Sequence, residues 1–331
     1  MGNRATSLIT RAEVERVLDV SDAIDAVEAA FRAYGEGRAQ LPPKPYLHFD
    51  KGDLRAMPAY VPDLGLATVK NVNVHPENRD LPVVMATVTV FDPETGFALA
   101  IMDGTYLTGM RTGAAGGVAA KYLARPDSSV VGLVGAGTQA TTQLSALACV
   151  LESIKRVNIF DVDEGKAEKF VEGSSAEHGL DVAVTDSVEE VVRNADVLVT
   201  TTPVREPIIR REWVRPGTHI NAIGADAPGK QELCPAILKD ARVVVDSREQ
   251  ASHGGEINVA LSEELITEED IYADIGEIVA GKKAGREDAD QVTVFDSTGL
   301  AIQDLACAVR VYRQLTEETG ELPTFDFLGS W

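Results

Sequence analysis

The chain has 331 residues, with 52 acidic and 31 basic side chains and a formal net charge of −21. Such a surplus of negative charge repels polyanions, so we expect no nucleic-acid partner and no membrane partner. The length favours two domains. The acidic residues are scattered rather than clustered, which indicates either a halophilic protein or ordinary acidic solubility.

Neither a targeting segment nor a disulfide framework is indicated. No stretch approaches the roughly 18 uninterrupted apolar residues of a membrane span, and we expect a cytoplasmic protein. Cys149, Cys234 and Cys307 are odd in number and far apart, which argues against disulfides and a cysteine zinc site. Cys149 lies in the apolar stretch LSALACVL and is expected to be a small core residue. The histidines and carboxylates show no metal-ligand spacing, so we expect no metal.

The first part of the chain contains two kinds of sequence pattern, one helical and one β-rich. Thr10 and Glu13 can form a capping box, and apolar residues then recur at helical spacing up to Gly35, which predicts one amphipathic helix in the first forty residues. Between residues 44 and 102, short β-rich segments alternate with turns, which predicts an antiparallel meander. Residues 108–124 are rich in small side chains and form a predicted helix.

From residue 129 onward, apolar runs alternate with helical patterns. The runs are SVVGLVG, RVNIFD, DVAVTD, ADVLVTTT, THINAIGA, ARVVVDS and QVTVFDS. Such runs are typical of strands buried on both faces, and their alternation with helices predicts a doubly wound parallel sheet of the Rossmann type, an α/β fold. A last amphipathic helix, LAIQDLACAVRVYRQLTEET, is expected to return to the first domain.

The segment VGLVGAGTQA carries a dinucleotide fingerprint. Gly135 permits a tight turn, Gly137 permits close approach of the backbone to a pyrophosphate, and Ala140 packs helix against strand. The next predicted strand ends in Asp161, whose carboxylate would bond a ribose 2′-hydroxyl and repel a 2′-phosphate. The pattern favours NAD over NADP as cofactor, although Asp163 could share the role of Asp161.

Several segments resemble the ornithine cyclodeaminase and mu-crystallin family. They are RAMPAY, VKNVNVHPENRDLPVVMAT, DPETGFALAIMDGTYLTGMRTGAAGGVAAKYLA, GLVGAGTQA, HINAIGADAPGKQEL and TVFDSTGLAIQD. The third and fifth are most similar to those of archaeal L-alanine dehydrogenases. The resemblance implies a homodimer in which residues 1–120 and 305–331 form an α+β substrate-binding and dimerisation domain. The NAD-binding Rossmann domain, residues 121–304, is inserted between them.

The resemblance also implies roles for charged residues. Lys70 matches the family's catalytic lysine, and a lysine inside an apolar strand alternation needs an anionic partner. Arg111 matches the arginine that holds the substrate carboxylate, and Arg55 resembles a second substrate-binding arginine. Lys44 is a third candidate for substrate binding, near a position where cyclodeaminases carry arginine. Asp226, after the segment THINAIGA, resembles the carboxylate that handles the amine or activates water; a turn or helix-cap aspartate is the alternative.

Further residues are expected to bind the cofactor: Thr112, Thr138, Gln139, Thr201, Thr202, Gly224, Ser297, Thr298 and Gly299. Lys70 and Asp226 belong to different predicted domains, so their chemistry would require both domains to contribute to one site. His75 and His219 have no triad-like neighbours in the sequence, and we expect structural roles for both.

The activity that the resemblance implies is reversible NAD-dependent oxidative deamination of a small L-amino acid, L-alanine to pyruvate and ammonia. Three alternatives stay open: ornithine cyclodeaminase, in which NAD carries a hydride internally, ketimine reductase, and a crystallin-like binding protein without catalysis. The presence of both Lys70 and Asp226 weighs against the last of these.

Overall fold

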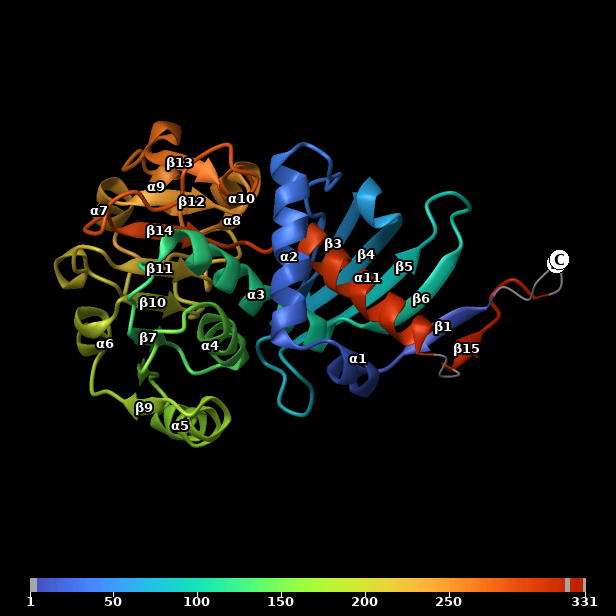
Figure 1. Cartoon of the computed structure of the whole chain (residues 1–331), viewed down its shortest axis with the longest axis horizontal. Coiled ribbons are helices and arrows are strands. Elements are labelled where there is room, and N and C mark those ends of the chain that lie inside the picture. The colour runs from blue at the N-terminus through green and yellow to red at the C-terminus, as the bar shows by residue number, and fades with distance from the viewer. Residues whose placement is uncertain (1–4, 319–321, 330–331) are drawn as a thin grey trace. The chain divides into compact units, whose positions relative to one another are not determined.

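The computed structural model describes residues 5–318 and 322–329, which divide into two compact units (Figure 1). Unit 1 contains the described residues of Met1–Arg111 and Leu300–Trp331, and unit 2 is Thr112–Gly299. Both boundaries come earlier in the chain than those expected from the sequence. The first of them falls within helix α3, Thr105–Leu123. Within the described ranges, no helix combines the length and apolar character needed to cross a membrane.

Unit 1 is built on a seven-stranded sheet with the order β15-β1-β6-β5-β4-β3-β2. Its strands are β1 Thr6–Ile9, β2 Tyr46–Phe49, β3 Gly52–Val61, β4 Leu66–Val74, β5 Val84–Phe91, β6 Ala98–Asp103 and β15 Thr324–Phe325. Strands β2 to β6 form the antiparallel meander that the sequence predicts. Strand β1 adds to β6 in parallel, and β15 pairs antiparallel with β1.

The first forty residues differ from the single helix expected. They contain strand β1 followed by two helices, α1 Arg11–Val17 and α2 Val20–Gly35. The expected Thr10–Glu13 contact is present, since Glu13 Oε2 accepts from the Thr10 amide at 2.6 Å. Asp19 accepts from the amide of Asp22 at 2.8 Å and thereby starts a second helix, where the sequence pattern alone suggested continuation.

Helix α11, Ala301–Glu317, packs in unit 1 against α2 and strands β3, β4 and β5, so the predicted return of the last helix is confirmed (Figure 1). Side chains of the sheet alternate between two faces. The buried face carries Met57, Lys70 and Val88, which are cross-strand neighbours in the register. Lys70 therefore lies on the core face of the sheet and not on a solvated one.

Unit 2 is built on an eight-stranded parallel sheet with the order β13-β12-β14-β11-β10-β7-β8-β9. Its strands are β7 Val130–Val134, β8 Arg156–Phe160, β9 Asp181–Val184, β10 Val197–Thr200, β11 His219–Ala222, β12 Arg242–Val245, β13 Ile271–Asp274 and β14 Thr293–Asp296. From β9 to β11 this order is that of the Rossmann fold, with its topological switch between β7 and β10, and β14 then lies between β11 and β12. The predicted doubly wound sheet is confirmed.

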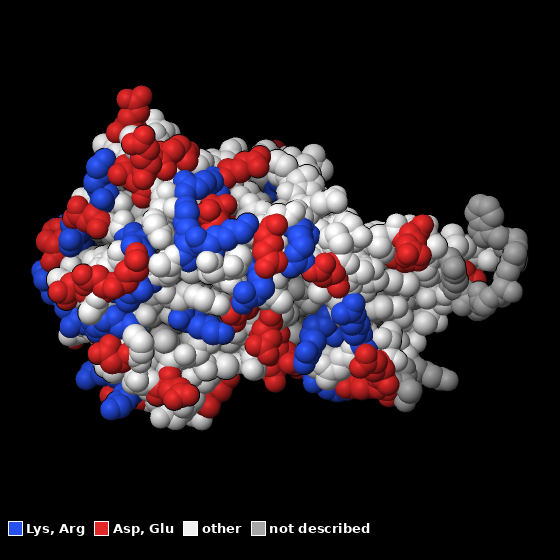
Figure 2. Space-filling view, turned by 45° about the horizontal axis from the view of Figure 1, so that its top comes forward, with Lys and Arg blue, Asp and Glu red and all other residues white. Residues whose placement is uncertain are grey.

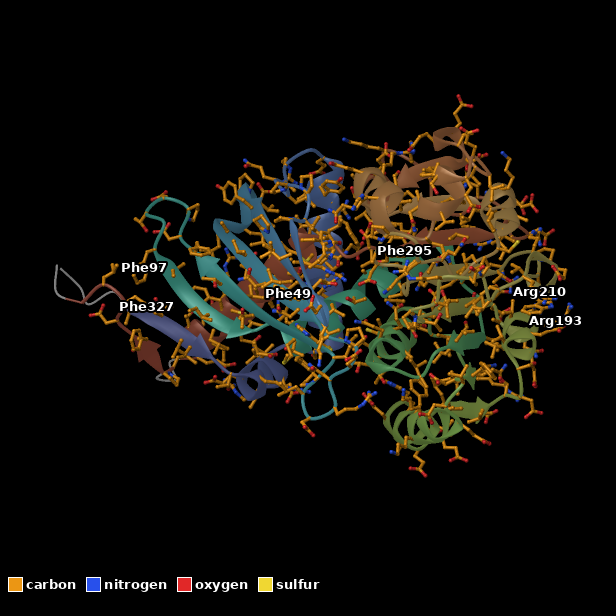
Figure 3. The ribbon with its side chains drawn as sticks, turned by 180° about the vertical axis from the view of Figure 1, so that it is seen from behind. Phe49, Phe97, Arg193, Arg210, Phe295 and Phe327 are labelled. Atoms are coloured by element: carbon orange, nitrogen blue, oxygen red, sulfur yellow. The ribbon has the colours of Figure 1, made fainter. Side chains whose placement is uncertain are left out.

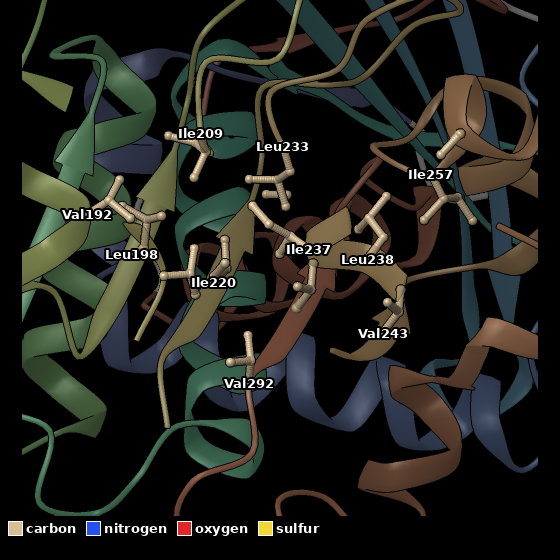
Figure 4. Packing of buried hydrophobic residues seen from close by; sticks show 14 of the residues in the cluster. Val192, Leu198, Ile209, Ile220, Leu233, Ile237, Leu238, Val243, Ile257 and Val292 are labelled. Carbon is tan, nitrogen blue, oxygen red and sulfur yellow. The ribbon is translucent and has the colours of Figure 1, made fainter. Parts of the chain in front are cut away.

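The helices of unit 2 connect its strands. They are α4 Thr138–Val150, α5 Glu164–His178, α6 Val188–Asn194, α7 Pro235–Asp240, α8 Arg248–Gly254, α9 Asn258–Ser262 and α10 Ile275–Val279. Successive strand residues pack into different clusters: Val197 and Val199 into one, and Leu198 into another with Ile220 and Val243 (Figure 4). Burial on both faces explains why these strands are uniformly apolar.

Two expectations for unit 2 need correction. Strand β13 was missed, because its sequence IYAD is short and lies between acidic helical segments. Cys149 is exposed, whereas the sequence suggested a core position. It lies near the end of α4, where neighbouring residues on the helix, Leu144 and Leu147, take the buried face instead.

Candidate functional site

The core face of unit 1 holds a cluster of charged side chains. Lys70 is 0 % exposed, and its Nζ donates to Asp304 Oδ1 at 2.8 Å. Arg111 Nε lies 3.0 Å from the same oxygen. Arg111 Nη1 also donates to Gln303 Oε1 at 2.9 Å. Strand β4, helix α3 and the first turn of α11 thus bring together two cations, one carboxylate and one side-chain amide.

This cluster is incompletely satisfied within the described residues. Asp304 Oδ2 and Gln303 Nε2 are buried and have no hydrogen-bond partner there. Buried polar atoms are nearly always paired with protein, water or ligand, so the cluster has capacity for a further polar group. Because two cations face one carboxylate, a small anion suits it.

Burial sets the protonation of Lys70. Loss of hydration and, after it, the nearby charge of Arg111 lower the pKa of Lys70, while Asp304 opposes both effects, and the net pKa is about 7. A lysine with that pKa can both release and accept a proton near neutral pH. The thiol of Cys307 lies in the same region, and burial raises its pKa to about 12, which keeps it protonated and unreactive.

The other predicted cations of unit 1 have different surroundings. Arg55 is buried and pairs with Asp53, through Nε at 2.8 Å from Oδ1 and Nη2 at 3.2 Å from Oδ2. Its guanidinium also lies over the ring of Tyr46, 5.2 Å from the centroid. Lys44 is partly buried and close enough to Lys70 for its charge to lower the pKa of Lys70.

In unit 2 the glycine-rich turn has the local geometry that the fingerprint predicts. Gly135 has φ +100°, and a Cβ there would lie 2.6 Å from Thr201 Oγ1, so only glycine fits. At Gly137 a Cβ would meet no atom within 4 Å, so its backbone is open to approach. Ala140 is fully buried in the core between helix and strand. Helix α4 begins at Thr138, and the side chain of Gln139 has a buried oxygen with no partner among described residues.

Asp161 lies against this turn. Its Oδ2 accepts from the amide of Ala136 at 2.8 Å, and its Oδ1 accepts from the amide of Asp163 at 2.9 Å. Asp163 is the N-cap of α5, where its side chain accepts from Lys166. The two aspartates thus have different local roles, with Asp161 beside the turn and Asp163 capping a helix.

The remaining predicted cofactor residues gather at the carboxyl ends of the central strands. Thr201 follows β10 and its Oγ1 donates to Val134 O at 3.3 Å, which joins it to the glycine-rich turn. Thr202 and Gly224 both contact the buried carboxylate of Glu232. Beyond β14, the segment Ser297, Thr298 and Gly299 is buried. In open α/β sheets this edge is where ligands bind.

Asp226 lies in the loop after β11, with one-third of its side chain exposed, and Lys230 Nζ lies 2.6 Å from its Oδ1. The sequence did not predict this lysine partner. Thr112, at the start of unit 2, accepts through its backbone oxygen from Gln143 Nε2 at 2.8 Å.

His219 belongs to a buried network of the protein core. Its Nδ1 lies 2.9 Å from Thr293 Oγ1 and its Nε2 lies 2.9 Å from Asn221 Oδ1. Burial lowers the pKa of His219 to about 3, so the ring is neutral at physiological pH. His75 stacks on Phe49 with ring centroids 6.2 Å apart. Among the residues that the structure describes, no cluster of three or more His, Cys, Asp or Glu side chains could hold a metal ion.

Comparison with known proteins assigns the chain to a family. The model of the ornithine cyclodeaminase/mu-crystallin family matches residues 4–319. The chain belongs to this family.

Among relatives of this family member, alanine dehydrogenase of Archaeoglobus fulgidus is 57% identical over 309 residues, covering 93% of this chain and 94% of that protein. An archaeal alanine dehydrogenase dimer solved with bound NAD is 54% identical, with a TM-score of 0.94 over 98% of this chain and 100% of that chain. The Δ1-pyrroline-2-carboxylate reductase of Thermococcus litoralis, solved with NADH and L-proline, is 38% identical, with a TM-score of 0.92 over 95% of this chain and 98% of that chain.

For this member of the family, sequence reasoning missed several buried polar residues of the two units: Gln303, Asp304, Glu232 and Asp246. One signal was available for the first two. The pair interrupts the apolar run LAIQDLACAV, and the first nine residues of α11 are all buried. A polar pair in such a helix needs buried partners. No comparable pattern marks Glu232 or Asp246.

Proposed function

We propose that this protein is an NAD-dependent L-alanine dehydrogenase, which converts L-alanine, NAD and water to pyruvate, ammonia, NADH and a proton. The proposal is supported by 57% identity to an alanine dehydrogenase over nearly the whole chain. The single structural observation that carries it is the buried Lys70–Asp304–Arg111 cluster, in which a titratable lysine and an arginine share one carboxylate.

The glycine-rich turn and its neighbours fit a dinucleotide. The open space at Gly137 admits a pyrophosphate beside the start of α4, and Asp161 provides a carboxylate for a ribose hydroxyl. Thr201, Thr202 and the segment 297–299 would hold the nicotinamide end. When bound, NAD accepts the hydride that leaves the Cα of the amino acid.

The chain's own residues then bind the amino acid and move protons. The guanidinium of Arg111 is suited to a carboxylate, and Gln303 Nε2 beside it can donate a further hydrogen bond to that group. Lys70 Nζ can accept a proton from the substrate ammonium or from water, because its pKa is about 7. Asp226 is the second candidate for activating water. Lys70 belongs to unit 1 and Asp226 to unit 2.

The decisive experiment incubates the purified protein with L-alanine and NAD and follows NADH absorbance. Accumulation of NADH that depends on L-alanine supports the proposal, and an equal rate with D-alanine would argue against it. A cyclodeaminase would instead release ammonia and proline from L-ornithine without net NADH. Reduction of a cyclic imine by NADH, with no oxidation of alanine, would identify an imine reductase.

We also propose that the protein is a homodimer that pairs through the open face of the unit 1 sheet. On that face the cross-strand rows of β3, β4 and β5 carry no charged residue: Leu54, Ala56, Pro58, Tyr60, Ala67, Val69, Asn71, Asn73, Met85, Thr87, Thr89 and Phe91. Each of these side chains is partly or fully exposed. An extended uncharged surface on a chain of net charge −21 favours contact with protein.

Exposed aromatic residues mark both ends of the same sheet. Phe49 on the edge strand β2 is 48% exposed, and Phe327, just beyond β15, is 57% exposed (Figure 3). Light scattering should give the mass of a dimer for the wild type and of a monomer for Val69→Asp. A wild type that stays monomeric at high concentration would refute this proposal.

Finally, we propose that the acidic surface is an adaptation to salt. Figure 2 shows Asp and Glu side chains spread over the visible face of unit 2, with Lys and Arg side chains among them. The Debye length falls from about 30 Å at 0.01 M salt to about 3 Å at 1 M, so salt screens the repulsion among carboxylates more strongly. The melting temperature should rise between low and molar KCl, whereas a flat or falling curve would contradict the proposal.

A further inference from the structure

Glu232 is a fully buried carboxylate that joins two strand-end loops of unit 2. Its Oε1 accepts from the amide and the hydroxyl of Thr202, each at 2.7 Å. Its Oε2 accepts from Thr200 Oγ1 at 2.7 Å and from the amide of Gly224 at 2.9 Å. One side chain therefore fixes the backbone after β10 and the backbone after β11.

The two loops are packed closely around this carboxylate. A Cβ at Gly224 would overlap the backbone of Thr202 and lie 2.7 Å from the Glu232 carboxyl carbon. Thr201, between the bonded residues, reaches back to Val134 and Gly135 in the glycine-rich turn. The shape of all three segments at the carboxyl edge thus depends on the position of Glu232.

Asp246 performs the same task for the segment beyond β14. It is 0 % exposed and follows β12 directly. Its Oδ2 accepts from the amides of Thr298 and Gly299, each at 2.7 Å, and its Oδ1 accepts from Thr298 Oγ1 at 2.9 Å. Gly299 has φ +78°, a left-handed conformation, and its amide donates to this carboxylate.

We propose that Glu232 and Asp246 are positioning residues that preform the nicotinamide end of the cofactor site. Neither needs to touch the cofactor, because each acts through the backbone amides that it orders. Loops that are already fixed lose less conformational freedom when a ligand binds, so affinity for the dinucleotide increases. This inference rests on the proposed NAD-dependent function.

The geometry requires an acceptor at both ends of the Glu232 carboxyl group, one for the amide of Thr202 and one for the amide of Gly224. In Glu232→Gln the amide keeps one oxygen, but an NH2 group replaces the other and faces donors. The hydroxyl of a threonine can rotate to accept, whereas the backbone amide of Thr202 or Gly224 cannot. One of the two loops therefore loses its anchor while the size of the side chain is unchanged.

The same sheet offers a matched control at its opposite edge. Asp196 precedes β10 and its Oδ2 accepts from the amides of Ser129 and Val130, at 2.9 and 3.1 Å. Asp196→Asn thus removes a carboxylate that ties loops at the amino ends of the strands, where no cofactor residue is proposed. It should lower the melting temperature without changing affinity for NADH.

The test compares wild type, Glu232→Gln, Asp246→Asn and Asp196→Asn by NADH fluorescence titration, by thermal melting without cofactor, and by the KM for L-alanine. We expect the Kd for NADH to rise at least tenfold in the first two variants, with the KM for L-alanine at saturating NAD within about twofold of wild type. Glu232→Asp, which keeps the charge, should recover part of the affinity.

Two outcomes would overturn the inference. The first is a lower melting temperature in Glu232→Gln and Asp246→Asn with unchanged NADH affinity, which would make both residues purely structural. The second is an equal loss of affinity in Asp196→Asn, which would trace the effect to general destabilisation. If Glu232→Gln does not fold, Asp246→Asn alone decides. Failure of the wild type to bind NADH would refute the proposed function itself. This result is distinguishable from failure of the inference about Glu232 and Asp246, which is judged only on a wild type that binds NADH.

Discussion

Replacement of Asp304 by asparagine tests the buried cluster of unit 1 most directly. The amide has nearly the same shape as the carboxylate, so packing around α11 is preserved. The change removes the anion that lies 2.8 Å from Lys70 Nζ and 3.0 Å from Arg111 Nε. Removing one partner of a buried ion pair typically costs about 3–5 kcal/mol, and here the cost depends on pH.

The direction in which stability changes with pH follows from the pKa of Lys70, which is lowered from 10.5 to about 7 in the folded protein. Between these values the unfolded chain binds a proton that the folded protein does not. Stability of the wild type linked to Lys70 therefore rises by about 1.4 kcal/mol per pH unit from about pH 7 to about pH 10, and it is flat below about pH 7.

Without Asp304 the pKa of Lys70 falls further, because burial and Arg111 are no longer opposed. The folded variant then keeps Lys70 neutral below pH 7, where the wild type already carries its proton. Stability of the variant continues to fall by about 1.4 kcal/mol per unit as the pH decreases, whereas that of the wild type does not. At about pH 6 the Lys70-linked difference reaches about 1.4 kcal/mol, and above about pH 8 it vanishes.

Urea unfolding of both proteins at about pH 6 and about pH 9 measures this difference. The loss of the Arg111 contact contributes equally at both values, because arginine stays charged, and so it cancels. The acid limb of kcat/KM for L-alanine should move to lower pH in the variant. An unfolding free-energy difference that is the same at both pH values, or larger at the alkaline one, would refute the assignment of Lys70 as the titrating partner of Asp304.

Four further substitutions test the glycine-rich turn, Lys70 and Asp161. Gly137→Ala should leave the melting temperature unchanged, because the added Cβ meets no protein atom, but it should raise the Kd for NADH at least tenfold, because the Cβ fills the space proposed for the pyrophosphate. Gly135→Ala should instead destabilise the fold by about 1–3 kcal/mol, because φ is +100° and the added Cβ would lie 2.6 Å from Thr201 Oγ1. Normal NADH binding by Gly137→Ala would contradict the proposed pyrophosphate site. Lys70→Ala should abolish alanine oxidation while NADH titration stays normal, and residual activity near that of wild type would remove Lys70 from the mechanism. Asp161→Asn should raise kcat/KM for NADP relative to NAD by about tenfold, because the repulsion between the carboxylate and the 2′-phosphate is lost. The asparagine oxygen can still accept from the amide of Ala136, so the turn keeps its shape. An unchanged ratio would assign cofactor choice to other residues.

Local sequence patterns predicted those parts of the site that are formed by neighbouring residues. The glycine-rich turn, the start of α4 and Asp161 at the end of β8 all lie where the fingerprint predicts. The same holds for the parallel strands, because burial on both faces forces a continuous apolar run. Boundaries within the first forty residues were wrong, since Asp19 as an N-cap was not distinguished from an ordinary polar helix residue.

The sequence by itself determined the two-part organisation, the Rossmann sheet, the glycine-rich turn and the presence of a lysine that could not be an ordinary core residue. Only the tertiary structure decided which groups surround that lysine. Lys70 and Asp304 are 234 residues apart, and Glu232 meets Thr200 across 32 residues. Patterns of period 2 or 3.6 report which face of an element is buried, but they carry no information on which distant element packs against that face. The pKa of a buried group, set by those distant neighbours, therefore follows from the fold and not from the local sequence.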